Sequence, residues 1–238
     1  TMAEIALHAI SMFKAWMITP YDIDTVIMSH DKDAIENMSS LVGGPNHPAW
    51  ALAISGVYRW YEEQMLARNA VDYDDIICIT TRALENPDNY RMRQHVAGEF
   101  DSIIIDEHQD SNEAQVRFAN AISSVPEHVV ELYTVGDDGQ SIYGWRGSEV
   151  RFIRERMAEP GMQTVSLFRN YRSSSPILRL ADHVLSHDDD VIPVDIKAAG
   201  SNAGIKSVPI MDIHQKESDE AIGVARGVQD LLNTGMCR

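Results

Sequence analysis

Two adjacent carboxylates, Asp106 and Glu107, follow directly on three isoleucines at residues 103–105. Because apolar β-branched residues favour buried strands, we expect both carboxylates where such a strand ends. In nucleotide-hydrolysing α/β folds, one carboxylate at this position holds Mg²⁺ and the next activates the attacking water. A strand that ends in Asp-Glu is a weak indication by itself, but Gln109 and Asp110 follow at fixed offsets. A nucleotide site is therefore the first hypothesis.

A second string, VGDDGQSIYGWRG, occupies residues 135–147. The side chain of Gln140 can both donate and accept hydrogen bonds around a phosphate. Tyr143 and Trp145 lie beside Arg146, and this combination of aromatic faces with a cation suits unpaired bases. As a chance loop the string would need several independent coincidences, so we interpret it as functional.

A third string, LFRNYRSSS, occupies residues 167–175. Tyr171 offers a flat face for a purine, and Arg172 offers a planar fork for phosphate oxygens. Taken alone, the string fits a salt-bridged helix entry equally well. Its position after the other two strings favours a role in nucleotide binding.

The elements that must position these strings change in character along the chain. Residues up to about 99 show the apolar spacing of helices, and from there strands alternate with helices, which predicts a parallel α/β sheet. Strands are predicted at residues 102–106, 129–135, 164–167 and 208–213, and helices in this region at about 112–124, 149–157, from 175 onward and at 219–232.

Composition limits the setting and the partners. No apolar run approaches the length of a membrane span, no secretion signal is visible, and two cysteines cannot form a disulfide framework. We therefore expect a protein of the reducing cytoplasm without a membrane partner. The net charge of −16 counts against a broad basic surface for nucleic acid, but not against a local groove.

In their order and spacing, the three strings resemble those of superfamily 1 DNA helicases of the UvrD/Rep/PcrA type. The middle string is a long and close match, and residues 69–76, NAVDYDDI, are similar to the helix that precedes the acidic strand in that family. The resemblance covers most of the chain from about Tyr58 onward. Two positions depart from the pattern, since His108 replaces Phe or Tyr and Gly139 replaces a frequent Asp.

The resemblance implies an ATP and Mg²⁺ site. In it, Asp106 would hold Mg²⁺ and Glu107 would activate the hydrolytic water. Gln109 would contribute to nucleotide binding and to the link with the nucleic-acid track. Tyr171 would stack on adenine, and Arg172 would act as an arginine finger on the γ-phosphate.

The resemblance also implies a DNA contact and its coupling to hydrolysis. Gln140 would sense the γ-phosphate, and Asp110 would couple the nucleotide site to the DNA track. Trp145 would stack on a base of single-stranded DNA, with Tyr143 and Arg146 supporting it. The implied activity is ATP-driven translocation along single-stranded DNA with duplex unwinding, typically 3′ to 5′, and DNA repair is one setting for it.

The implied fold is a P-loop NTPase of the RecA-like type, with an incomplete parallel sheet and an N-terminal helical subdomain. Residues 1–99 would form the helical insertion, residues 100–168 the later half of the first motor domain, and residues 169–238 the start of the second. These correspond to the 1B, 1A and 2A domains of the family.

Two family strings have no counterpart in this chain: the phosphate loop, and the later arginine-bearing string that completes the second motor domain. The phosphate loop, G-x-x-x-x-G-K-[ST], cradles the β- and γ-phosphates, and it does not occur among the 238 residues. We therefore expect a central fragment that is inactive alone and pairs with the missing portions of the same helicase. Its first sheet should have an exposed edge or find a substitute partner. The motor part of a recombination helicase–nuclease and a non-catalytic nucleic-acid or protein interaction module remain the alternatives.

Overall fold

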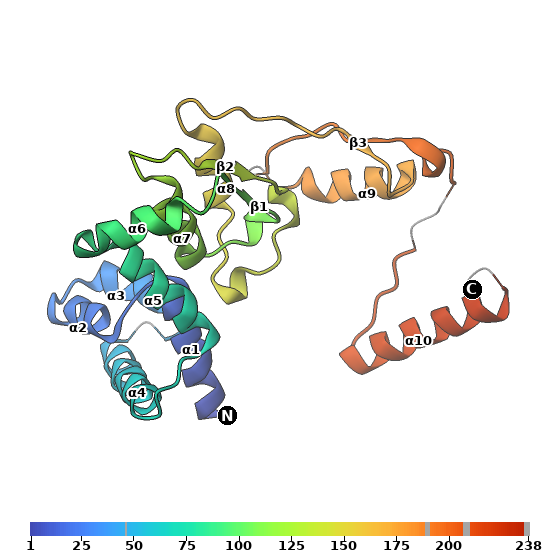
Figure 1. Ribbon diagram of the computed structural model, residues 1–238. Helices are drawn as coiled ribbons and strands as arrows, with labels where there is room; N and C mark the ends of the chain where they lie inside the picture. The colour runs from blue at the N-terminus through green and yellow to red at the C-terminus, as the bar shows by residue number, and fades with distance from the viewer. Residues whose placement is uncertain (46, 189–190, 207–209, 236–238) are drawn as a thin grey trace. The chain divides into compact units, whose positions relative to one another are not determined.

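The computed structural model describes residues 1–45, 47–188, 191–206 and 210–235 (Figure 1). The chain divides into two compact units, Thr1–Thr164 and Val165–Arg238, and each is described by itself. Within the described part of the chain, no helix has the length and apolar character needed to cross a membrane.

The first hundred residues of the first unit are helical, as the sequence predicts. Local signals explain where several helices begin: Thr1, Thr19 and Asp72 each form a capping box, and Pro48 lies in the first turn of its helix. The helices are α1 (Met2–Ala15), α2 (Pro20–Met28), α3 (Lys32–Leu41), α4 (Pro48–Ala67), α5 (Tyr73–Glu85) and α6 (Tyr90–Ala97), with the short 3₁₀ turn η1 (Pro87–Asn89) before α6.

A hydrophobic core joins α1, α2, α3 and α4. Phe13 of α1 is fully buried and stacks on Tyr58 of α4, with ring centroids 6.4 Å apart. Ile23 and Ile54 pack into the same cluster. Burial of these apolar side chains is the main contribution that stabilises the packing of the four helices.

The predicted strand–helix–strand unit is present around the acidic pair. Strand β1 (Ser102–Ile105) lies parallel to β2 (Glu131–Thr134), and α7 (Glu113–Ser123) forms the connection between them. A second core cluster joins α7 of this unit to α5 and α6, and Ile103 of β1 packs against it. Among the described residues, this sheet contains only β1 and β2.

The loops after the two strands carry the short elements that shape the candidate site. The 3₁₀ turn η2 (His108–Asp110) follows β1, while η3 (Asp138–Gln140) and η4 (Gly144–Arg146) follow β2. Helix α8 (Arg151–Ala158) comes next. An isolated antiparallel bridge between Asn112 and Ser148 ties the start of α7 to the end of the η4 loop.

The second unit contains a separate small sheet. Strand β3 (Arg169–Asn170) pairs in parallel with β4 (Lys197–Ala198), and the remaining elements are α9 (Ser175–Leu185), η5 (Gly200–Asn202) and α10 (Glu217–Asn233). The described residues thus form two two-stranded parallel sheets, one in each unit, and the strand pairing is parallel as predicted.

Two predicted strands do not form in the described residues. Residues 164–167 form no strand, and Val165 and Leu167 are 80% and 78% exposed. Residues 210–213 form no strand either, while residues 208 and 209 lie outside the described residues. An apolar run becomes a strand only where another strand pairs with its N–H and C=O groups, and neither segment has such a neighbour in the described structure.

Candidate functional site

The predicted acidic pair lies at the carboxyl end of β1 and is exposed. Asp106 accepts a hydrogen bond through Oδ1 from the backbone N–H of Glu107, over 3.0 Å. Glu107 itself adopts a left-handed backbone conformation, with φ 49° and ψ 46°, which is uncommon for a residue with a side chain. The turn separates the two carboxylates and leads the chain directly into η2.

Gln109 joins the acidic pair to the second string. Its side chain is 1% exposed, and its Nε2 donates to Oε2 of Glu107 over 2.7 Å. Its Oε1 accepts from the backbone N–H of Asp137 over 3.0 Å, so one amide contacts both loops. A Cβ on Gly136 would lie 2.5 Å from that Oε1, which explains a glycine at this close approach.

Gln140, predicted to sense the γ-phosphate, lies exposed in the loop that Gln109 contacts. Its Nε2 donates to Oδ2 of Asp137, whose Oδ1 accepts from the backbone N–H of Gly139 over 3.1 Å. Asp137 was not predicted as a site residue, yet it connects Gln109 to Gln140 within two hydrogen bonds. Its place in the Gly-Asp-Asp string was the only signal in the sequence.

His108 is buried rather than presented to a substrate. Its backbone N–H donates to the carbonyl of Val135 over 2.9 Å, and its Nδ1 lies 3.0 Å from Oγ of Ser111. Burial, with a smaller contribution from the charge of Arg156, lowers the pKa of the imidazole. His108 therefore serves as a packing residue in the first unit.

Tyr143, Trp145 and Arg146 gather in one exposed turn, as predicted. The two aromatic rings have centroids 6.3 Å apart, and the Arg146 guanidinium lies 5.8 Å from the Tyr143 ring and 5.6 Å from the Trp145 ring. Trp145 is 63% exposed, so its ring is available for stacking. The turn borders a groove of about 530 Å³, whose lining also includes residues of α1, of α5 and of the start of α7.

A second cavity, of about 640 Å³, lies beside the acidic pair. Asp106 and Glu107 line it together with apolar side chains of β1, α5, α6 and α7. Asp110 and Gln115 line both this cavity and the groove at Trp145. The predicted coupling residue Asp110 therefore lies between the acidic pair and the stacking turn.

Asp106 fits the kind of Mg²⁺ site that accompanies a nucleotide. Mg²⁺ is usually held by one or two carboxylates together with phosphates and waters, rather than by an all-protein cage. Asp106 is exposed, and only its Oδ1 accepts a hydrogen bond from another described residue. The described residues contain no group of three or more His, Cys, Asp or Glu suited to a metal ion.

Tyr171 and Arg172 belong to the second unit and are both exposed. Asn170 orders their loop, because its Oδ1 accepts from the backbone N–H groups of Arg172 and Ser173 over 2.9 and 2.7 Å. Asn202 also donates to the carbonyl of Arg172 over 2.8 Å. The predicted contacts of Tyr171 with adenine and of Arg172 with the γ-phosphate stay predictions.

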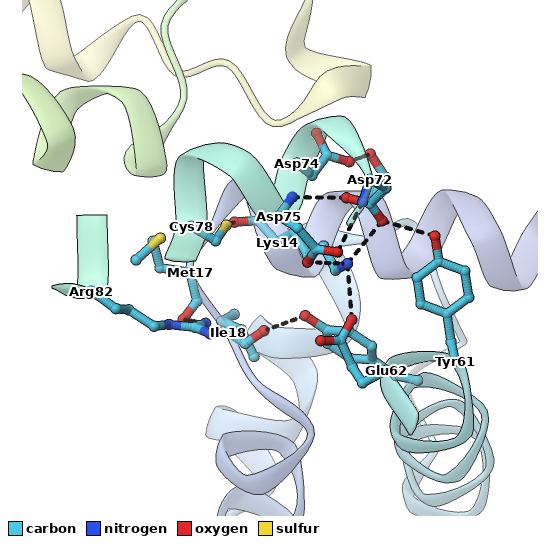
Figure 2. A network of polar contacts seen from close by, with 12 residues as sticks. Lys14, Met17, Ile18, Tyr61, Glu62, Asp72, Asp74, Asp75, Cys78 and Arg82 are labelled. Carbon is cyan, nitrogen blue, oxygen red and sulfur yellow. Dashed lines mark hydrogen bonds and ion pairs between the residues drawn. The ribbon is translucent and has the colours of Figure 1, made fainter. Parts of the chain in front are cut away.

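Sequence reasoning missed a buried charge cluster around Lys14, shown in Figure 2. The ammonium of Lys14 is 2% exposed and lies 2.8 Å from Asp72, 2.5 Å from Asp75 and 2.9 Å from Glu62. Burial alone lowers the pKa of Lys14, but hydrogen bonds to these carboxylates outweigh it and raise the pKa above its ordinary value. The signal was a lysine on the apolar face of a helix, together with the acidic residues of NAVDYDDI.

Tyr61 completes the Lys14 cluster. Its hydroxyl donates to Oδ2 of Asp72 over 2.8 Å, and Figure 2 shows this bond on the side of Asp72 away from α5. Burial and the bond to Asp72 raise the pKa of Tyr61 to about 12. The cluster therefore joins α1, α4 and the N-terminus of α5 through charged and hydrogen-bonded groups.

Comparisons with known proteins identify the family. The model of the UvrD/REP helicase N-terminal domain matches residues 25–159. Similar curated proteins include the ATP-dependent DNA helicase PcrA of Staphylococcus epidermidis, 33% identical over 184 residues, which are 76% of this chain and 24% of the relative. The PcrA of Leuconostoc citreum is 30% identical over 187 residues, or 78% of this chain and 24% of the relative.

The chain spans about a quarter of the length of these relatives. The PcrA of Staphylococcus aureus is 32% identical over 150 residues, or 63% of this chain and 20% of the relative. The family match covers more than half of the chain and includes the acidic pair, the Gln109 bridge and the Trp145 turn. The protein therefore belongs to the UvrD/REP helicase N-terminal domain family.

Proposed function

We propose that this chain supplies the hydrolytic carboxylates and the DNA-stacking turn of an ATP-dependent DNA helicase. That helicase would move along single-stranded DNA in the 3′ to 5′ direction and unwind duplexes. The observation that carries the proposal is the Gln109 side chain, which bonds to Glu107 and to the loop that continues to Gln140 and Trp145. A single buried amide thus links a group suited to hydrolysis with groups suited to base stacking.

In the proposed nucleotide site, Glu107 accepts a proton from the attacking water. Its Oε2 is oriented by Gln109, which leaves Oε1 to face the reacting groups. A bound Mg²⁺, held by Asp106, would neutralise charge on the phosphates. Tyr171 would stack on adenine, and Arg172 would contact the γ-phosphate.

Changes at the γ-phosphate would reach the DNA through the second string. Gln140 contacts Asp137, and Asp137 contacts Gln109. A shift of Gln140 towards or away from a phosphate would therefore change the hydrogen bonds that orient Glu107. Asp110, which lines both cavities, would respond to the same shift from the side of η2.

The proposed domain layout follows the family. Residues 1–99 would form the helical insertion, residues 100–168 the later half of a RecA-like motor domain, and residues 169–238 the start of the second. The β1–α7–β2 unit supports this layout, because its parallel strands and crossover helix form the repeating unit of such sheets. Polypeptide with the phosphate loop would be the partner that completes the nucleotide site in the cytoplasm.

The DNA contact can be tested with a matched pair of exposed tryptophans. Trp145 is 63% exposed on the stacking turn, and Trp60 is 60% exposed on α4. Anisotropy of a fluorescein-labelled single-stranded oligonucleotide would give the affinity of each variant. We expect Trp145→Ala to weaken binding by about 1–3 kcal/mol, the usual value of one base stack, and Trp60→Ala to leave it unchanged. Equal affinities for both variants and the parent chain would remove the DNA contact from the proposal.

A further inference from the structure

The groove beside the stacking turn has two walls from distant parts of the sequence. Tyr143, Trp145 and Arg146 form one wall, and side chains of α1 and of the start of α5, among them Ser11 and Asp74, form the other. The distance between these walls decides whether a flat base fits against Trp145. Whatever fixes α1 therefore also shapes the groove.

The stacking turn rests directly on the C-terminal half of α1. Gly147, which ends the turn with φ +82°, approaches so closely that an added Cβ would lie 2.9 Å from Cβ of Ala15. Sδ of Met12 and Nε1 of Trp16 lie 3.8 and 3.6 Å from the same point. Because the contact is backbone against a helix face, a shift of α1 must move the turn with it.

Within the same helical turn, α1 is held to α5 by polar bonds. Lys14 contacts Asp72 and Asp75, which begin α5, as Figure 2 shows. Ser11 Oγ donates to Oδ2 of Asp74 over 2.6 Å, and Cys78 Sγ lies 3.1 Å from the carbonyl oxygen of Lys14. Anchoring residues at 11 and 14 thus alternate with residues at 12 and 15 that contact the stacking turn.

The charge balance of the cluster favours a geometric role over a purely stabilising one. One buried ammonium contacts three carboxylates, from α4 and from the start of α5. Buried ion pairs contribute little net stability, because desolvation offsets the attraction between the charges. They do demand defined positions of their partners, since a misplaced buried charge is strongly unfavourable.

We propose that Lys14 is a positioning residue for DNA binding, which fixes α1 against α5 and so sets the width of the groove beside Trp145. The inference rests on the proposed stacking role of Trp145. Lys14 lines this groove, but its side chain is 2% exposed and its ammonium contacts three carboxylates, so the proposed role is to position the groove rather than to contact DNA.

The test uses the 238-residue chain and the same labelled oligonucleotide. Lys14→Met is compared with Lys32→Met, which removes an exposed lysine at the start of α3 and serves as the charge-matched control. Thermal melting identifies a temperature at which each variant is folded. There we expect Lys14→Met to weaken DNA binding about tenfold, as for coupled neighbouring residues, and Lys32→Met to leave it unchanged.

A double-mutant cycle distinguishes positioning from stability. If Lys14 positions the turn, Trp145→Ala costs less affinity in the Lys14→Met background than in the parent chain. An unchanged cost, together with unchanged affinity of Lys14→Met, would assign Lys14 to stability alone and overturn the inference. Should Lys14→Met not fold, Ser11→Ala, which removes the bond to Asp74, takes its place with the same expectations.

The two proposals fail in different ways. If Trp145→Ala leaves affinity unchanged in the parent chain, the proposed DNA contact is wrong and the role of Lys14 fails with it. If Trp145→Ala weakens binding but neither the Lys14 nor the Ser11 variant does, the DNA contact stands and only the positioning role is rejected.

Discussion

Gln109 donates from Nε2 to Oε2 of Glu107 over 2.7 Å, and its other amide atom accepts from the backbone of Asp137. Both ends of this buried amide are therefore engaged, and neither contact can form if the amide is reversed. The acidic pair and the loop of the second string are held as one unit by a residue that is 1% exposed.

Removing the Gln109 amide should destabilise the first unit. Gln109→Leu leaves the backbone N–H of Asp137 without its partner, and we expect a loss of about 1–3 kcal/mol in the free energy of unfolding. Urea denaturation followed by circular dichroism measures it. Gln140→Leu is the control, because Gln140 is exposed and solvent replaces its bond. Equal losses in the two variants would contradict a central role for Gln109.

Gly136→Ala should disturb the same bridge from the other side. The new Cβ would lie 2.5 Å from Oε1 of Gln109 and 2.8 Å from Cδ1 of Ile153, so the bridge must move. We expect destabilisation of about 1–3 kcal/mol, as for other overpacked sites. Gly144→Ala meets nothing within 4 Å and should be nearly neutral. If Gly136→Ala leaves the free energy of unfolding unchanged in the same urea titration, the loop has room to shift.

His108 carries a buried polar atom that a family-typical aromatic residue would lack. Among the described residues its Nε2 has no hydrogen-bond partner, while its Nδ1 contacts Ser111. The double variant His108→Phe/Ser111→Ala removes the imidazole and the hydroxyl together. We expect it to raise the free energy of unfolding by about 1 kcal/mol. His108→Ala should instead destabilise it by roughly 2 kcal/mol or more, because it leaves a cavity. If thermal unfolding ranks the two variants in the opposite order, the imidazole is more than a packing group.

The Asp72 carboxylate should make stability depend on acidity. Burial alone raises its pKa, but hydrogen bonds from Lys14, the Asp75 backbone and Tyr61 bring the pKa below the ordinary value of 3.8. The folded state therefore binds this proton at lower pH than the unfolded state does. Its contribution to stability is present above pH 3.8 and is lost as pH falls through the lowered pKa.

Asp72→Asn tests this dependence and keeps a side chain that can cap α5. We expect the variant to be less stable than the parent at neutral pH and to lose less stability as the pH falls below 3.8. Urea midpoints at each pH provide the comparison. If the urea midpoints of the two proteins fall in parallel with pH, other carboxylates cause the loss of stability in acid.

The chain by itself should not turn over ATP, because its 238 residues contain no phosphate-loop string to hold the β- and γ-phosphates. Phosphate release from Mg²⁺–ATP should stay at background for both the parent chain and Glu107→Gln. Turnover by the parent that disappears in Glu107→Gln would show that the chain holds the nucleotide by other means. Turnover that persists equally in both would indicate a contaminating enzyme.

The sequence by itself determined the features that depend on near neighbours. Capping residues such as Asp72 and the first-turn Pro48 marked helix starts, and the isoleucines before Asp106 marked β1. The order and spacing of three strings predicted the family, and the family match confirms it. These signals are local, because a cap or a strand periodicity is complete within a few residues.

The tertiary structure decided which distant residues meet. Lys14 reaches Asp72 and Asp75 across 58 and 61 positions of the chain, and Gln109 reaches Asp137 across 28. The strand expected at residues 164–167 failed for the same reason, since pairing begins only at Arg169, opposite Lys197. Such contacts depend on how whole elements pack, which no local pattern encodes. The residue types at the site could therefore be predicted from the sequence, but the bridge through Gln109 and the anchoring of the Trp145 turn on α1 could not.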